Sequence, residues 1–160
     1  LRMPAQVMFA AFSVLVDIAE ESGNYSEDDV KIMYGIATDI CYPVMAYNGT
    51  LIELVGSNPS GQNLTVYINS IVNSLLWRSA FFHMLIERNE LEEWQNGNSN
   101  CRSVAAMGTY GDDIKGTVKP GYDFFNHISF AEFLSKRGMK FTMPDKKSTP
   151  VPYMNDADAE

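Results

Sequence analysis

Apolar residues recur at helical spacing along three stretches of the chain. Residues 4–21 and 27–42 show this spacing, and so do residues 64–87. A proline lies in the first turn of the first stretch, where a helix tolerates it, and another proline follows the second stretch. Ser26 lies three residues before Asp29, which is a capping-box arrangement for the second stretch. The pattern therefore predicts three helices.

Two pairs of strand-like runs are each separated by turn residues. Residues 44–47 and 51–55 flank an Asn-Gly pair, and Asn-Gly between apolar runs is the strongest short signal for a hairpin. Residues 103–109 and 114–118 flank a Tyr-Gly-Asp-Asp tetrapeptide. The sequence predicts a β-hairpin at each place.

The remaining segments predict one more helix and one more strand. Residues 87–100 are polar and indicate a frayed helix end followed by a surface loop. Ser129 and Glu132 form a capping-box pair for a helix over residues 130–137. Residues 139–143 predict a short strand. This order of elements predicts an α+β fold, with helices packed on an antiparallel sheet.

Asp112 and Asp113 lie at the expected tip of the second hairpin. Adjacent carboxylates repel each other, so such a turn is stable where solvent or a cation screens them. Asp and Gly also favour surface turns for backbone reasons alone. The tetrapeptide by itself leaves a metal site and an ordinary surface turn both open.

A polar stripe runs along the third predicted helix. Thr65, Asn69 and Asn73 follow one another at intervals of four residues, beside the apolar face. Short polar side chains are mediocre helix formers, so their stacking indicates a face directed at a polar ligand, and a solvated helix face is the alternative. The lead-in at residues 59–61 brings backbone N–H groups and a hydroxyl to the start of this helix, which suits an anion or a sugar hydroxyl.

Length and charge narrow the class of protein. The 160 residues, 46% of them hydrophobic, fit one domain or a piece of a larger one, and we expect an excerpt from a longer polypeptide. The net charge of -8 disfavours binding of a polyanion through overall electrostatics but leaves room for a local basic groove. The two cysteines form neither a disulfide framework nor a zinc spacing, which favours a reducing compartment. No stretch approaches the length of a membrane span.

These residues together resemble the motifs of viral RNA-dependent RNA polymerases. The resemblance is to the picornavirus-like group, particularly polymerases of picorna-like viruses from insects and marine hosts. Motif B of that family is Ser-Gly, then Thr, then Asn four residues later, and the matching residues here are Ser60, Gly61, Thr65 and Asn69. The tetrapeptide at residues 110–113 matches motif C. The order of helix, strand, Pro and Lys-Ser over residues 130–148 follows the loosely defined motif D.

The resemblance implies a catalytic role for two carboxylates and a lysine. The family adds ribonucleotides to a primer 3′-end on an RNA template by two-metal nucleotidyl transfer. Asp112 would be a direct ligand of Mg²⁺, or of Mn²⁺ in its place, and Asp113 would have a secondary part at the same metal. Lys147 would be the general acid that protonates the pyrophosphate leaving group, and an alignment shift of one residue would give that role to Lys146.

The resemblance also implies a nucleotide-binding role for the motif B residues. Thr65 and Asn69 would help to recognise the ribose 2′-hydroxyl, which separates NTP from dNTP. Ser60 would take part in that hydrogen-bond network, and Gly61 would be the hinge of the loop.

The implied domain is part of a polymerase catalytic domain. Residues 1–160 would hold the palm subdomain with motifs B, C and D, and residues from about 22 to 58 would be an insertion on the fingers side. Motifs A and E are expected to be missing, so the fragment alone is expected not to polymerise. The implied partners are an RNA template and primer, ribonucleoside triphosphates and other viral replication proteins. The implied location is the host cytoplasm, in membrane-associated replication complexes, without direct membrane insertion.

Two other functions stay open from the sequence. A reverse transcriptase palm also carries a Tyr-x-Asp-Asp hairpin, although Gly111 and the motif B block favour the enzyme that makes RNA. A noncatalytic acidic module is the other, in which Asp112 and Asp113 hold Ca²⁺ or only turn the chain.

Overall fold

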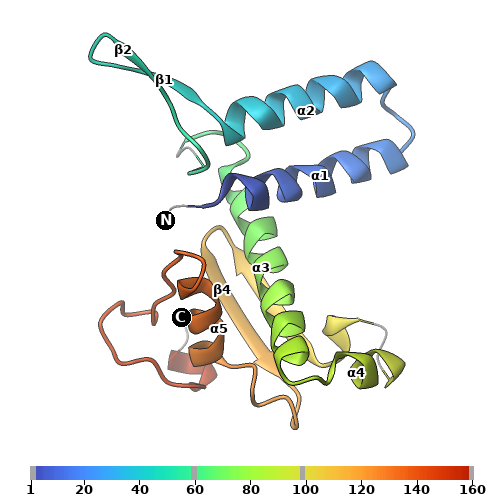
Figure 1. Ribbon diagram of the computed structural model, residues 1–160, viewed down its shortest axis with the longest axis vertical. Helices are drawn as coiled ribbons and strands as arrows, with labels where there is room; N and C mark the ends of the chain where they lie inside the picture. The colour runs from blue at the N-terminus through green and yellow to red at the C-terminus, as the bar shows by residue number, and fades with distance from the viewer. Residues whose placement is uncertain (1–2, 59–60, 98–99, 159–160) are drawn as a thin grey trace. The chain divides into compact units, whose positions relative to one another are not determined.

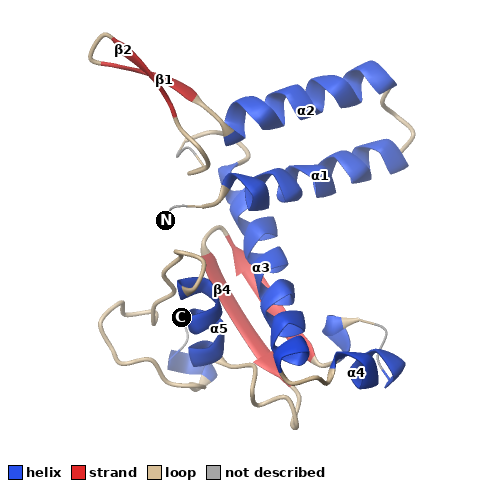
Figure 2. Ribbon diagram, viewed as in Figure 1, coloured by secondary structure: helices blue, strands red, loops and turns tan. Residues whose placement is uncertain are grey.

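The structure is a computed structural model that describes residues 3–58, 61–97 and 100–158 (Figure 1). These residues form an α+β fold of helices and two small two-stranded sheets, which confirms the predicted class (Figure 2). The chain divides into two compact units. The first comprises residues 1–72 together with 110–112, and the second comprises residues 73–109 together with 113–160.

Two antiparallel helices make up much of the first unit. Helices α1 (Ala5–Glu21) and α2 (Glu27–Cys41) lie along each other in Figure 1 and contact each other. The buried side chains of α1 are Ala5, Met8, Ala11, Phe12 and Val16. The predicted capping box is confirmed, since Ser26 Oγ accepts the Asp29 N–H at 3.2 Å and the Asp29 carboxylate accepts the Ser26 N–H at 2.8 Å.

The first hairpin is confirmed at its turn and is shorter than predicted in its second strand. Strands β1 (Val44–Tyr47) and β2 (Thr50–Glu53) pair antiparallel, with Val44 opposite Glu53. Asn48 and Gly49 have φ of 46° and 79°, as a type I′ turn requires. All side chains of both strands are exposed. After the hairpin, the Ser57 N–H donates to the Met3 carbonyl at 3.0 Å, so the chain returns to the start of α1.

Helix α3 (Thr65–Glu87) confirms the longest predicted helix. Its first part, through Val72, belongs to the first unit, and the rest belongs to the second. The buried side chains of the second part include Leu76, Trp77, Ala80, Phe81, Met84 and Leu85. These residues carry α3 into the core of the second unit.

Aromatic side chains form the core of the second unit around the predicted second hairpin. Strands β3 (Ala105–Tyr110) and β4 (Asp113–Val118) pair with each other. The Trp77 ring lies 4.5 Å from Phe125 and 5.5 Å from Phe130, centroid to centroid. A Cβ added at Gly116 of β4 would lie 2.3 Å from the Trp77 ring, so this glycine is required by the close approach of the indole.

Three predictions in the second unit are wrong in detail. Residues 87–100 contain helix α4 (Leu91–Gly97), because Trp94 is buried, with 7% of its surface exposed, and packs its ring against Phe81 and Phe82. The segment is therefore held by apolar packing despite its polar composition.

The last helix begins earlier than predicted. Helix α5 (His127–Ser135) is capped by Asn126, whose Oδ1 accepts the N–H groups of Ile128 and Ser129. Ser129 is the reciprocal partner of that box, because its Oγ accepts the Asn126 N–H at 3.0 Å. The expected Ser129–Glu132 pair is therefore not the cap.

Residues 139–143 are not a strand, which corrects the third prediction. A strand needs a neighbour that pairs with its backbone N–H and C=O groups, and in the described part of the chain no strand pairs with this segment. Met139 and Met143 are buried, and the Phe141 ring packs 5.1 Å from Phe130, so side-chain packing holds the segment.

Among the described helices, none is both long and apolar enough to cross a membrane.

Candidate functional site

The Tyr-Gly-Asp-Asp tetrapeptide forms the tight turn of the second hairpin. Tyr110 ends β3 and Asp113 begins β4, so Gly111 and Asp112 are the two turn residues. Gly111 has φ of 60°, and of the two turn residues only Gly111 has a positive φ, which matches a type II′ turn. Both carboxylates are exposed, as is Tyr110, with 76% of its surface accessible. The turn therefore presents Asp112 at the tip and Asp113 at the first strand position beside it.

A hydrogen bond joins this turn to the start of helix α3. The N–H of the buried Gly111 donates to Ser70 Oγ at 2.9 Å, across 41 positions of sequence. Ser70 directly follows Asn69, so the bond brings the segment expected to bind nucleotide to the segment expected to bind metal. Sequence reasoning did not identify Ser70, because a serine inside a helix carries no signal of a contact so distant in the chain.

A second set of hydrogen bonds fixes the first turns of α3. Asn58 Nδ2 donates to Asn69 Oδ1 at 2.8 Å and to the Thr65 carbonyl at 3.3 Å. Gln62 Nε2 in turn donates to Asn58 Oδ1. Thr65 and Asn69, which are both half-buried, therefore belong to one network with the loop before the helix.

The other motif B residues lie in the loop that leads to α3. Gly61 is exposed and has φ of 93°, a left-handed conformation that other residues rarely adopt. The hinge role expected of Gly61 stays a prediction. Ser60 lies outside the described residues. Asn73, the third member of the predicted stripe, belongs to the second unit.

The carboxylates of the turn fit a hard, oxygen-seeking metal ion. Mg²⁺ keeps several waters and is usually bound through one or two carboxylates together with substrate phosphates. In the described part of the chain, no group of three or more His, Cys, Asp or Glu residues could hold a metal ion. Asp112 and Asp113 are adjacent and exposed, so both carboxylates are open to such an ion.

Lys147 lies in a turn of the second unit that a carboxylate organises. Asp145 accepts the backbone N–H of Lys147 at 3.1 Å and that of Ser148 at 3.0 Å, and it also accepts the Ser148 hydroxyl. The hydroxyl bond, followed by these backbone bonds, holds the pKa of Asp145 below its ordinary value. Lys146 has φ of 60°, and both lysines are exposed.

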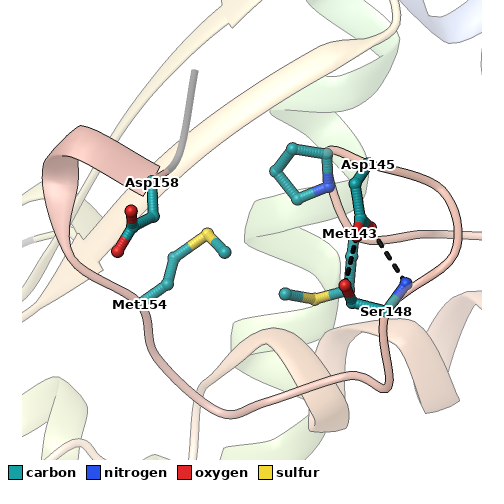
Figure 3. A pocket seen from close by; sticks show the side chains of 6 residues that line it. Met143, Asp145, Ser148, Met154 and Asp158 are labelled. Atoms are coloured by element: carbon teal, nitrogen blue, oxygen red, sulfur yellow. Dashed lines mark hydrogen bonds between the residues drawn. The ribbon is translucent and has the colours of Figure 1, made fainter.

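Asp145 and Ser148 also line a hollow of about 370 Å³ in this part of the second unit, shown in Figure 3. Met143 lies on the Ser148 side of the view, while Met154 and Asp158 come from the chain that follows. Lys147 lies between Asp145 and Ser148 in sequence, but it is not among the residues that line the hollow.

Comparisons with known proteins identify the family. The family model for viral RNA-dependent RNA polymerases matches residues 2–158. The chain is 27% identical over 154 residues to the genome polyprotein of Deformed wing virus, which covers 94% of the chain and 5% of that polyprotein. It is 27% identical over 143 residues to the replicase polyprotein of Cricket paralysis virus, covering 89% of the chain and 8% of that polyprotein.

A shorter match to the RNA1 polyprotein of Cherry rasp leaf virus is 33% identical over 93 residues and covers 58% of the chain and 4% of that polyprotein. The chain thus spans a small part of the length of these relatives. No solved structure gives a significant match. Because the family model covers nearly the whole chain, the resemblance seen in the sequence is confirmed, and the chain belongs to the viral RNA-dependent RNA polymerase family, in its picorna-like group.

Proposed function

We propose that these residues supply the catalytic turn and the nucleotide-selecting helix start of an RNA-directed RNA polymerase. The enzyme adds ribonucleotides to a primer 3′-end on an RNA template. One observation carries the proposal: Ser70 Oγ accepts the Gly111 N–H at 2.9 Å, which ties the motif B helix directly to the motif C turn.

Asp112 is the proposed metal ligand, and Asp113 supports it. Both are exposed, and Asp112 stands in a turn whose glycine leaves room for close approach of a primer end. Bound Mg²⁺, or Mn²⁺, would stabilise negative charge on the attacking and leaving oxygens. The protein's own contribution is to hold the carboxylates at a fixed tip, which the short turn and the Gly111–Ser70 bond do.

Thr65 and Asn69 are the proposed nucleotide-binding residues on α3, with Ser60 and Gly61 in the loop before it. Asn69 is half-buried and bonded to Asn58, so its amide is held in place before any substrate arrives. A held polar group discriminates better than a mobile one, because it pays less ordering entropy on binding. This supports a role in reading the ribose 2′-hydroxyl.

Lys147 is the proposed general acid for the pyrophosphate leaving group. Asp145 fixes the backbone at Lys147 and at Ser148, while the Lys147 side chain stays exposed. A fixed backbone with an exposed ammonium suits a group that must reach a phosphate. Lys146 is the neighbouring candidate for the same role.

The domain assignment and partners follow from the family and belong to the same proposal. Residues 1–160 form part of the polymerase catalytic domain with palm motifs B, C and D, and residues from about 22 to 58 lie on the fingers side. The partners are an RNA template and primer, ribonucleoside triphosphates and other viral replication proteins. The enzyme works in host cytoplasm on membrane-associated replication complexes.

Substrate preference tests the proposed function. A polymerase that contains these residues is purified and given an RNA primer on an RNA template, with either NTPs or dNTPs. Extension with NTPs, strongly preferred over dNTPs, is the expected result. A preference for dNTPs would identify a reverse transcriptase, and absence of extension with either substrate would favour a noncatalytic module.

A further inference from the structure

We propose that Asn58 is a positioning residue for sugar selection: it holds the Asn69 side-chain amide in one orientation, with the NH₂ group directed at the incoming nucleotide. The inference rests on the proposed function of Asn69 in reading the ribose. It adds a residue that lies before motif B and would act through Asn69.

The orientation of the Asn69 amide follows from a backbone carbonyl, which can accept hydrogen bonds but cannot donate them. The Thr65 backbone carbonyl can only accept, so the Asn58 atom 3.3 Å from it must be the amide nitrogen. The same Asn58 nitrogen lies 2.8 Å from the Asn69 side chain, so the Asn69 atom that faces it must be the oxygen. The Asn69 NH₂ is thereby turned away from Asn58.

Gln62 contacts the other end of the Asn58 amide, where Asn58 Oδ1 accepts from Gln62 Nε2. A flip of Asn58 would set its oxygen against the Thr65 carbonyl, and that contact would be repulsive. The Asn58 amide therefore has one favourable orientation, and it imposes one on Asn69.

A fixed NH₂ at Asn69 suits selection between ribose and deoxyribose. The 2′-hydroxyl oxygen accepts a hydrogen bond, whereas deoxyribose has no acceptor at that position. A site built to bond a substrate hydroxyl rejects the analogue that lacks it, because the polar group of the site loses its partner. An Asn69 amide free to rotate would spend part of its time with the oxygen forward and would select less well.

Three variants test the inference in a polymerase that contains these residues. Asn58→Ala removes the donor, and Asn58→Asp removes it while keeping the shape of the side chain. Asn63→Ala is the matched control, since Asn63 is an exposed asparagine in the same loop. The readout is kcat/KM for an NTP divided by that for the corresponding dNTP. This ratio does not depend on the fraction of active enzyme, because the same molecules use both substrates.

We expect the ratio to fall about three- to tenfold in both Asn58 variants, the range of one hydrogen bond, and to stay unchanged in Asn63→Ala. In an Asn69→Ala background, Asn58→Ala should lower it no further, because the two residues act as one unit. If Asn69→Ala lowers the ratio while both Asn58 variants keep the wild-type value, the inference is overturned and the role of Asn69 stands. If Asn69→Ala keeps the wild-type ratio, the proposed role of Asn69 fails, and the inference fails with it.

Discussion

Replacing Gly116 by alanine should destabilise the second unit through a clash with Trp77. The added Cβ would lie 2.3 Å from Cη2 of the indole, 2.7 Å from Cζ2 and 3.0 Å from Cζ3. Ordinary contact begins near 3.4 Å, so the ring or the strand must move by about 1 Å. The ring has little freedom to do so, because it packs 4.5 Å from Phe125 and 5.5 Å from Phe130 and only 8% of its surface is exposed.

Overpacking of this kind costs about 1–3 kcal/mol. Gly108 provides the matched control, since it lies in the neighbouring strand β3 and a Cβ there would meet no atom within 4 Å. Gly108→Ala should be neutral or should stabilise by about 0.4–1 kcal/mol, because alanine restricts the unfolded chain more than glycine does. The two substitutions are chemically identical, so their opposite effects would isolate the contact with Trp77.

Thermal unfolding of the polymerase variants measures the difference. Gly116→Ala should lower the Tm, and Gly108→Ala should leave it unchanged or raise it. In a Trp77→Leu background the additional loss from Gly116→Ala should shrink, because the smaller side chain leaves space for the methyl group. An equal Tm for Gly116→Ala and wild type, or an equal loss for both glycine variants, would refute the packing argument.

Other predictions concern the turn, a helix cap and a carboxylate. Ser70→Ala should slow primer extension about two- to tenfold, because it removes the acceptor for the Gly111 N–H at a cost of about 0.5–1.5 kcal/mol; wild-type rates in single-turnover assays would contradict this. Asn126→Ala should lower the free energy of unfolding by about 1 kcal/mol, measured by urea titration, because α5 loses its cap. Asp145 should titrate below its ordinary pKa of 3.8 in NMR spectra, and Ser148→Ala should raise the pKa of Asp145. Because the folded state lowers this pKa, the stability that ionised Asp145 adds is present above about pH 4 and is lost as the pH falls through the folded-state pKa.

Local signals explain which parts of the fold could be predicted. The Ser26–Asp29 box and the Asn-Gly turn depend on residues close in sequence, and both are present as expected. The cap of α5 was misplaced because Ser129 and Glu132 match the capping pattern as well, and only the backbone geometry shows that Asn126 takes the N–H groups. A local pattern cannot decide between two overlapping caps.

Long-range packing explains the other differences. Trp94 folds a polar segment into α4 because Phe81 and Phe82 lie beside it, which residues 87–100 alone do not reveal. Residues 139–143 have the composition of a strand, but a strand depends on a partner elsewhere in the chain.

The residues of the candidate site also differ in whether a local sequence signal marks them. Thr65 and Asn69 could be selected as candidates from their spacing, because helical residues four apart share a face, and their role stays a prediction. Asn58 and Ser70 could not, since one lies in an irregular loop and the other bonds a residue 41 positions away. Contacts between segments distant in the chain are therefore harder to predict from sequence than the regular spacing of residues on one helix.

The most direct measurement of the central claim is the single-turnover rate of primer extension by Asp112→Asn at saturating NTP and Mg²⁺. Asparagine keeps the shape of the side chain and removes the charge that a metal ion requires. Metal ions supply several kcal/mol of charge stabilisation, so we expect a loss of at least about a hundredfold, whereas Asp17→Asn on the exposed face of α1 should react at the wild-type rate. Extension by Asp112→Asn at the wild-type rate would contradict the assignment of this turn to the catalytic metal.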